Sequence, residues 1–142
     1  MTRRRKEPRW LGASFAVYAN REVVAQSGGI AGVRDMGLLE SALARGAQRW
    51  AYDESADLCD AAAAVCYGVC KNHPFLDGNK RTAFQCAYVI LRTNGLRLKA
   101  DELDVVMEME MLADGRRSER DCASFLRINA LGKQSARRKK RG

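Results

Sequence analysis

The sequence has little of what membrane proteins and β-proteins require. No apolar run is long enough to cross a bilayer, and the basic first nine residues are not followed by the apolar core of a signal peptide. We therefore expect no membrane partner and a cytoplasmic location. Strand-like alternation is confined to residues 96–99. With 142 residues, 46% of them hydrophobic and 30% charged, the composition favours one soluble, helical domain.

The cysteines also lack a pattern that would indicate chemistry. There are five, an odd number, and none forms a C-x-x-C pair. Cys66 and Cys70 are one helical turn apart, and all five lie in apolar stretches that are typical of helices: Cys59, Cys66, Cys70, Cys86 and Cys122. We expect buried free thiols in a reducing compartment.

The net charge of +8 lies at the two ends of the chain. Residues 1–10 carry five basic groups and one acidic group, residues 133–142 carry six basic groups and none acidic, and the remainder carries −2. A nucleic-acid-binding domain would carry this charge on a folded face. We therefore predict a basic tail over 1–13, a domain over 14–131, and a basic, disordered tail over 132–142. The tails can add only weak, salt-sensitive attraction for RNA or acidic surfaces.

Apolar periodicity predicts a first helix over residues 14–26, with Ser14 as its N-cap. Its buried face would carry four residues: Phe15, Tyr18, Ala19 and Val23. Asp35 is suited to cap a second helix. The glycine-rich residues 28–34 between the two helices are either a flap over an active site or a plain linker.

Two further helices are predicted over 57–72 and 79–94, on either side of a short loop. The first is apolar on nearly every face, so we expect it to run through the middle of the domain. Residues 96–99 suggest a small strand without an evident partner. Asp101 caps another expected helix, and Ser118 with Asp121 forms a variant capping box before the last one.

The loop between the two central helices gathers the residues that can perform chemistry. His73, the only histidine, could accept a proton, and Asp77 could hold Mg²⁺ against phosphates. Gly78, Lys80 and Arg81 begin the next helix, whose free N–H groups and positive dipole end favour anions. Each residue alone has an ordinary structural explanation, as a cap or a solvated turn. Their combination within nine residues favours a phosphate site.

Residues 72–84, which read NHPFLDGNKRTAF, closely resemble the Fic/Doc family, and in particular the Doc toxins of addiction modules. Residues 32–43 and 94–98 look like the same branch. The resemblance implies an all-α, compact Fic-type helical bundle with the active-site loop between two central helices. It also implies that His73 is a general base and that Asp77 binds Mg²⁺. The phosphates of the nucleotide would be held by Gly78, Asn79, Lys80 and Arg81, while Phe75 locks the loop.

Two positions depart from the AMP-transferring Fic pattern, because Lys80 replaces its second glycine and Phe84 its last arginine. In Doc-type proteins this variant is associated with transfer of the γ-phosphoryl group of ATP to a threonine of elongation factor Tu, which stops translation. The chain shows no autoinhibitory segment with a glutamate for that arginine, so the resemblance predicts a separate antitoxin. Two alternatives stay open: transfer of AMP, and a non-catalytic binding protein that acts through its basic tails.

Overall fold

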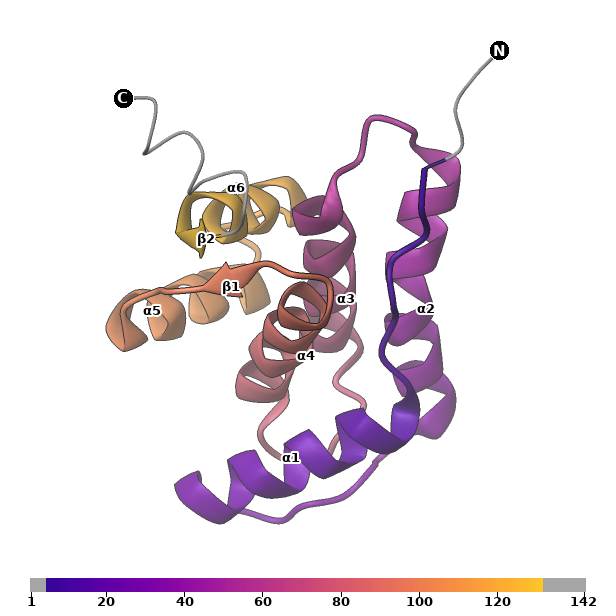
Figure 1. Ribbon diagram of the computed structural model, residues 1–142. Helices are drawn as coiled ribbons and strands as arrows, with labels where there is room; N and C mark the ends of the chain where they lie inside the picture. Colours follow the sequence, from indigo (N-terminus) through magenta and orange to yellow (C-terminus); the bar gives the residue numbers. More distant parts are fainter. Residues whose placement is uncertain (1–4, 132–142) are drawn as a thin grey trace.

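A computed structural model describes residues 5–131, and in this range the chain forms six helices and one small sheet (Figure 1). The fold is all-α, as the sequence predicted. The elements are α1 (Ala13–Ser27), α2 (Met36–Tyr52), α3 (Leu58–Asn72), α4 (Asn79–Thr93), β1 (Arg97–Leu98), α5 (Glu102–Ala113), α6 (Glu119–Asn129) and β2 (Ala130–Leu131).

Helix α3 lies at the centre and packs against α2, α4, α5 and α6, as its apolar sequence predicted. A capping box of Asp57 and Asp60 starts the helix, and ten of its fifteen residues are buried. Small residues let the neighbours approach closely: a Cβ atom at Gly68 would lie 3.0 Å from the Cα of Ala42 on α2. This close packing fixes the end of α3 from which the next loop departs.

Helix α4 packs beside α3 and contributes five buried residues to the shared core: Ala83, Cys86, Ala87, Ile90 and Leu91. It ends at Thr93 with Asn94 as its C-cap, and Gly95 follows with a φ of 92°, a backbone conformation that favours glycine. The α3–α4 loop, residues 73–78, joins the two helices at the end of the molecule that α1 crosses (Figure 1). The predicted active-site loop therefore lies between two central helices.

The prediction for α1 was wrong in detail. The helix begins one residue earlier, with Gly12 at the N-cap and no side-chain cap, so Ser14 does not cap it. Phe15 and Tyr18, which we placed in the core, are 39% and 56% exposed, and their rings lie against each other at 6.2 Å. The buried face lies one residue further along, because small residues allow α1 to approach its neighbours there: Ala16, Ala19, Asn20, Val23 and Val24.

The predicted N-terminal tail, residues 1–13, includes residues that pack against the domain. Residues 5–12 run along α2 (Figure 1), and the Arg5 guanidinium lies 3.7 Å from the centre of the Trp50 ring. The same group donates hydrogen bonds to the carbonyls of Ala56 and Trp50. Trp10 packs against the core and beside Gly46. This segment therefore belongs to the domain, whereas the predicted tail over 132–142 lies outside the described residues.

The expectation that residues 96–99 lack a partner was also wrong. β1 pairs antiparallel with β2, and Leu98 lies opposite Ala130. Two residues per strand give too little pattern for the sequence to reveal this pairing. The Ser118–Asp121 capping box is confirmed, but Asp101 precedes α5 without a capping hydrogen bond from its side chain.

All five cysteines are buried and free, which confirms this part of the prediction. Burial raises the pKa of the Cys59 thiol to about 11 and that of Cys86 to about 12, which makes both poor nucleophiles. Among the described residues, no helix is both long and apolar enough to traverse a bilayer.

Candidate active site

His73 ends α3 in a left-handed conformation with a φ of 49°, and it is the one non-glycine residue among 5–131 with a positive φ. This conformation costs a non-glycine residue about 1–2 kcal/mol, so neighbouring contacts must hold it. Pro74 follows and prevents the helix from continuing. As a result the chain turns sharply, and the imidazole lies on the cavity described below.

Asn79 locks the α3–α4 loop. Its Oδ1 atom accepts a hydrogen bond from the Phe75 N–H at 2.9 Å, and its Nδ2 group donates one to the Phe75 carbonyl at 3.0 Å. Phe75 is 1% exposed and anchors the loop in the core, as predicted. Because the Asn79 side chain is buried in these contacts, its predicted role toward phosphate can involve only its backbone N–H.

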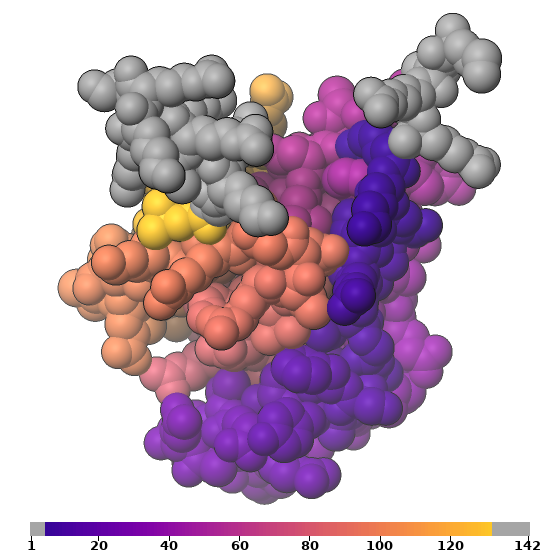
Figure 2. Space-filling model, viewed as in Figure 1, coloured from indigo at the N-terminus to yellow at the C-terminus, as the bar shows by residue number. Residues whose placement is uncertain are grey.

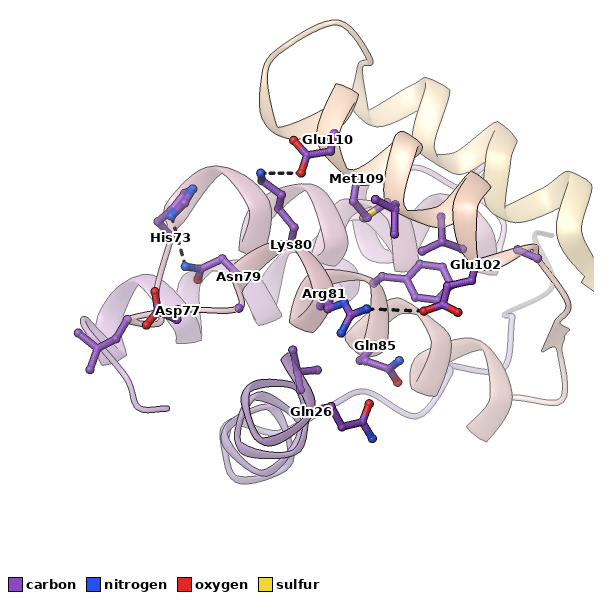
Figure 3. A pocket seen from close by; sticks show the side chains of 17 residues that line it. Gln26, His73, Asp77, Asn79, Lys80, Arg81, Gln85, Glu102, Met109 and Glu110 are labelled. Atoms are coloured by element: carbon purple, nitrogen blue, oxygen red, sulfur yellow. Dashed lines mark hydrogen bonds and ion pairs between the residues drawn. The ribbon is translucent and has the colours of Figure 1, made fainter. Parts of the chain in front are cut away.

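The same Asn79 side chain also contacts the imidazole. Its Nδ2 group lies 3.3 Å from Nδ1 of His73 (Figure 3). Since Phe75 fixes the amide orientation, Nδ2 faces the ring as a donor and Nδ1 must accept. In a neutral imidazole this contact favours the tautomer with its proton on Nε2.

The N-terminus of α4 has no side-chain cap. Gly78 is its N-cap, with a φ of 75°. The positive φ favours glycine, and a Cβ atom here would also lie close to the side chains of Val24 and Val23, at 3.1 and 3.3 Å. The N–H groups of the first turn therefore stay available for an anionic ligand.

The flap, residues 28–34, is hydrogen-bonded to the α3–α4 loop. The Ile30 N–H donates to Oδ2 of Asp77 at 2.7 Å, and the Leu76 N–H donates to the Gly32 carbonyl at 2.9 Å. Val33 and Phe75 form an isolated antiparallel bridge. The sequence left open whether this segment is a flap or a linker, and its position beside Asp77 favours the flap.

Asn20 is a buried polar residue that sequence reasoning missed. It is 1% exposed, and its Nδ2 group donates to the Asp77 carbonyl at 2.8 Å and to Oγ1 of Thr82 at 3.2 Å. Its Oδ1 atom accepts from the Gly32 N–H at 3.2 Å. One side chain thus joins α1 to the flap, the loop and α4. An asparagine inside the apolar stripe of a helix was the available signal.

These elements surround one cavity of about 670 Å³ between α1, α4 and α5, within the range of small-molecule sites. The space-filling view shows the surface hollowed between α1 and α5 (Figure 2). One part of its lining is polar and carries His73, Asp77, Lys80 and Arg81. Another part is apolar and carries Phe84, Val105, Val106 and Met109.

Two glutamates of α5 pair with the cations of α4 across this cavity (Figure 3). Nζ of Lys80 lies 3.0 Å from Oε1 of Glu110, and Nη2 of Arg81 lies 3.6 Å from Oε1 of Glu102. Each partner is more than a third exposed, and such surface pairs contribute about 0–1 kcal/mol. The cations are therefore held loosely. Neither glutamate was foreseen from the sequence, because both lie about twenty to thirty residues beyond the motif.

The chain belongs to the Fic/Doc family, and its relatives place it in the Doc branch. A sequence model described as the Fic/DOC family matches residues 10–91, which include the flap, α3, the loop and most of α4. The helices α5 and α6 lie beyond the matched part.

The chain is similar to two named proteins. The chain is 43% identical over 90 residues to "Toxin Doc" of Mycolicibacterium smegmatis, an alignment that covers 59% of this chain and 69% of that protein. It is 36% identical over 75 residues to "Protein kinase doc" of Escherichia phage P1, covering 53% of this chain and 60% of that protein.

Proposed function

We propose that this protein is a Doc-like toxin that transfers the γ-phosphoryl group of ATP to a threonine of elongation factor Tu and so stops translation. One observation carries the proposal: His73, Asp77 and the N-terminus of α4 meet at one cavity of about 670 Å³. The name of one relative, a toxin, supports the proposed toxicity, and the name of the other, a protein kinase, supports transfer of a phosphoryl group to a protein.

The phosphates of ATP would lie at the N-terminus of α4. Gly78 allows the backbone to approach them closely, and the N–H groups of the first helical turn would donate to their oxygens. Lys80 and Arg81 would exchange their glutamate partners for phosphate, which carries more charge. Phosphoryl transfer depends mainly on positioning and on neutralising charge, so these groups supply what the reaction needs.

The residues present suit Mg²⁺. Oδ2 of Asp77 is fixed by the Ile30 N–H at 2.7 Å, whereas Oδ1 accepts no hydrogen bond from the residues that the structure describes. The described part of the chain contains no cluster of three or more candidate ligands. Mg²⁺ often uses one or two carboxylates together with phosphates and water, so a single Asp77 is enough. When bound, the ion would neutralise phosphate charge.

His73 would take the proton from the threonine hydroxyl as the oxygen bonds to the γ-phosphorus and the bond to ADP breaks. The products are phosphothreonine and ADP, and the proton stays on the imidazole until it passes to water. To accept it at Nε2, the neutral ring must carry its other proton on Nδ1. That tautomer has no acceptor for the Asn79 amide, so the 3.3 Å contact must open first.

Phe84 favours phosphoryl over AMP transfer. It lines the cavity one helical turn beyond Lys80. At this position the sequence pattern of AMP-transferring Fic proteins has its last arginine. An aromatic ring cannot pair with phosphate, but it can contact a nucleobase or ribose together with Val106 and Met109. The nucleotide would therefore lie in a different orientation from the one that an arginine imposes.

We also propose that a separate small antitoxin controls the enzyme by covering this cavity. The name of the toxin relative supports a toxin–antitoxin module. Since Phe84 cannot pair with an inhibitory glutamate, control by a segment of the same chain through that contact is not available. The partner is expected to contact α1 and α5, which flank the cavity.

The proposal is tested with ATP labelled on either the γ- or the α-phosphate and purified elongation factor Tu. The expected result is γ-label on the factor with wild-type protein and none with His73→Ala. Label from the α-position would establish AMP transfer instead. If neither label is transferred and toxicity survives in His73→Ala but not after removal of residues 132–142, the binding protein acting through its tails is correct.

A further inference from the structure

The guanidinium of Arg34 holds two carbonyls at the end of α3. Its Nε group donates to the His73 carbonyl at 2.8 Å, and its Nη2 group donates to the Asn72 carbonyl at 3.0 Å. The Arg34 backbone N–H donates to the Pro74 carbonyl at 2.7 Å. Arg34 belongs to the flap, so three consecutive carbonyls of the α3–α4 junction are held from a segment almost forty residues away.

This arrangement is suited to a strained junction. The last carbonyls of a helix lack partners within the helix, and a planar guanidinium can satisfy two neighbouring acceptors at once. His73 is the one non-glycine residue among 5–131 with a positive φ. The carbonyl group and the side chain of His73 are both attached to its Cα atom. Hydrogen bonds that hold the carbonyl therefore restrain the position from which the imidazole projects.

We propose that Arg34 is a positioning residue: through the His73 and Asn72 carbonyls it holds the His73 backbone, and thereby aims the imidazole into the cavity. The importance of this for turnover rests on the proposed function, in which His73 accepts a proton. The positioning of His73 by Arg34 does not rest on the proposed function, and it can be measured without an activity assay.

The variant Arg34→Lys tests this because it keeps the positive charge but replaces the planar fork with a single ammonium group. Arg34→Gln, with one amide donor, is the second variant should the first fold poorly. The matched control is Arg5→Lys. Arg5 donates to the carbonyls of Trp50 at 2.8 Å and Asp53 at 3.1 Å, at the end of α2 and away from the cavity.

His73 is the only histidine in the sequence, so its imidazole signals in an NMR spectrum need no assignment by mutation. We expect the signals to shift or broaden in Arg34→Lys and Arg34→Gln, and to coincide with those of wild type in Arg5→Lys. In the transfer assay, the kcat of Arg34→Lys should fall about tenfold while the KM for ATP changes less than about twofold.

The proposal is overturned if the imidazole signals of both folded Arg34 variants coincide with wild type, or if Arg5→Lys moves them equally. The two failures can be told apart. If wild type transfers no label, the proposed function has failed, and the NMR comparison still decides whether Arg34 positions His73.

Discussion

The two walls of the cavity are held in different ways. The wall formed by the α3–α4 loop and the start of α4 is fixed by buried contacts: Asn79 locks Phe75, and Asn20 binds the Asp77 carbonyl. The wall formed by α5 meets it through two exposed ion pairs, Lys80–Glu110 and Arg81–Glu102. Buried hydrogen bonds resist rearrangement, whereas exposed ion pairs exchange partners easily. In the proposed reaction, the first wall would hold the reacting groups and the second would adjust the access of the nucleotide.

Among changes that keep the His73 side chain, the largest effect is expected from Gly78→Ala. The new Cβ would lie 3.1 Å from Val24 in a backbone with a φ of 75°, which strains an alanine, so either the Val24 side chain gives way or the N-terminus of α4 is displaced. A displacement of about 1 Å can lower a rate about a hundredfold, and we expect such a loss in the transfer assay. Gly95→Ala is the control, because it has the same backbone strain, with a φ of 92°, but no atom within 4 Å. Equal losses in both variants would show that strain alone is responsible.

The difference between the walls also explains what the sequence could predict. His73, Asp77 and Gly78 lie within six consecutive positions, so their proximity follows from the chain itself and the loop was found directly. Asn20 and Arg34 reach the same loop from other elements, and only the packing of α1 and the flap brings them there. Glu110 was missed for the same reason.

The helices followed from local signals where those signals were strong. The Ser118 cap and the apolar α3 were recognised, because capping boxes and all-round burial leave clear patterns. The buried face of α1 was not recognised, because the large aromatic residues Phe15 and Tyr18 were expected to be buried. Tertiary packing selected the smaller residues instead.

A loss of stability is expected from Asn20→Ala. The change leaves the Asp77 carbonyl, the Thr82 hydroxyl and the Gly32 N–H without this partner. An unsatisfied buried polar group costs about 1–3 kcal/mol, so the free energy of unfolding measured with urea should fall by at least this amount. Asn129→Ala, which removes a side-chain bond to the Phe125 carbonyl on α6, is a milder control. If the free energy of unfolding falls equally little in both variants, Asn20 does not join the elements as described.

A small gain in the affinity for ATP is expected from a change in the α5 wall. Glu110→Gln removes the charge that pairs with Lys80 at 3.0 Å and that would repel phosphate. Since exposed pairs contribute about 0–1 kcal/mol, the affinity for ATP measured by calorimetry should rise by up to about fivefold. Glu40→Gln, on the exposed surface of α2, should leave it unchanged. Weaker binding would mean that Glu110 orients Lys80 for the nucleotide rather than competing with it.

The most direct test of the central claim compares wild type with His73→Ala in two assays on the same preparations: calorimetric binding of ATP with Mg²⁺, and mass spectrometry of threonine phosphorylation on elongation factor Tu. We predict that ATP binds both proteins with similar affinity and that only wild type yields phosphothreonine. Phosphothreonine from His73→Ala at the wild-type rate would contradict a role for His73 as the base, because the proton would then be accepted elsewhere.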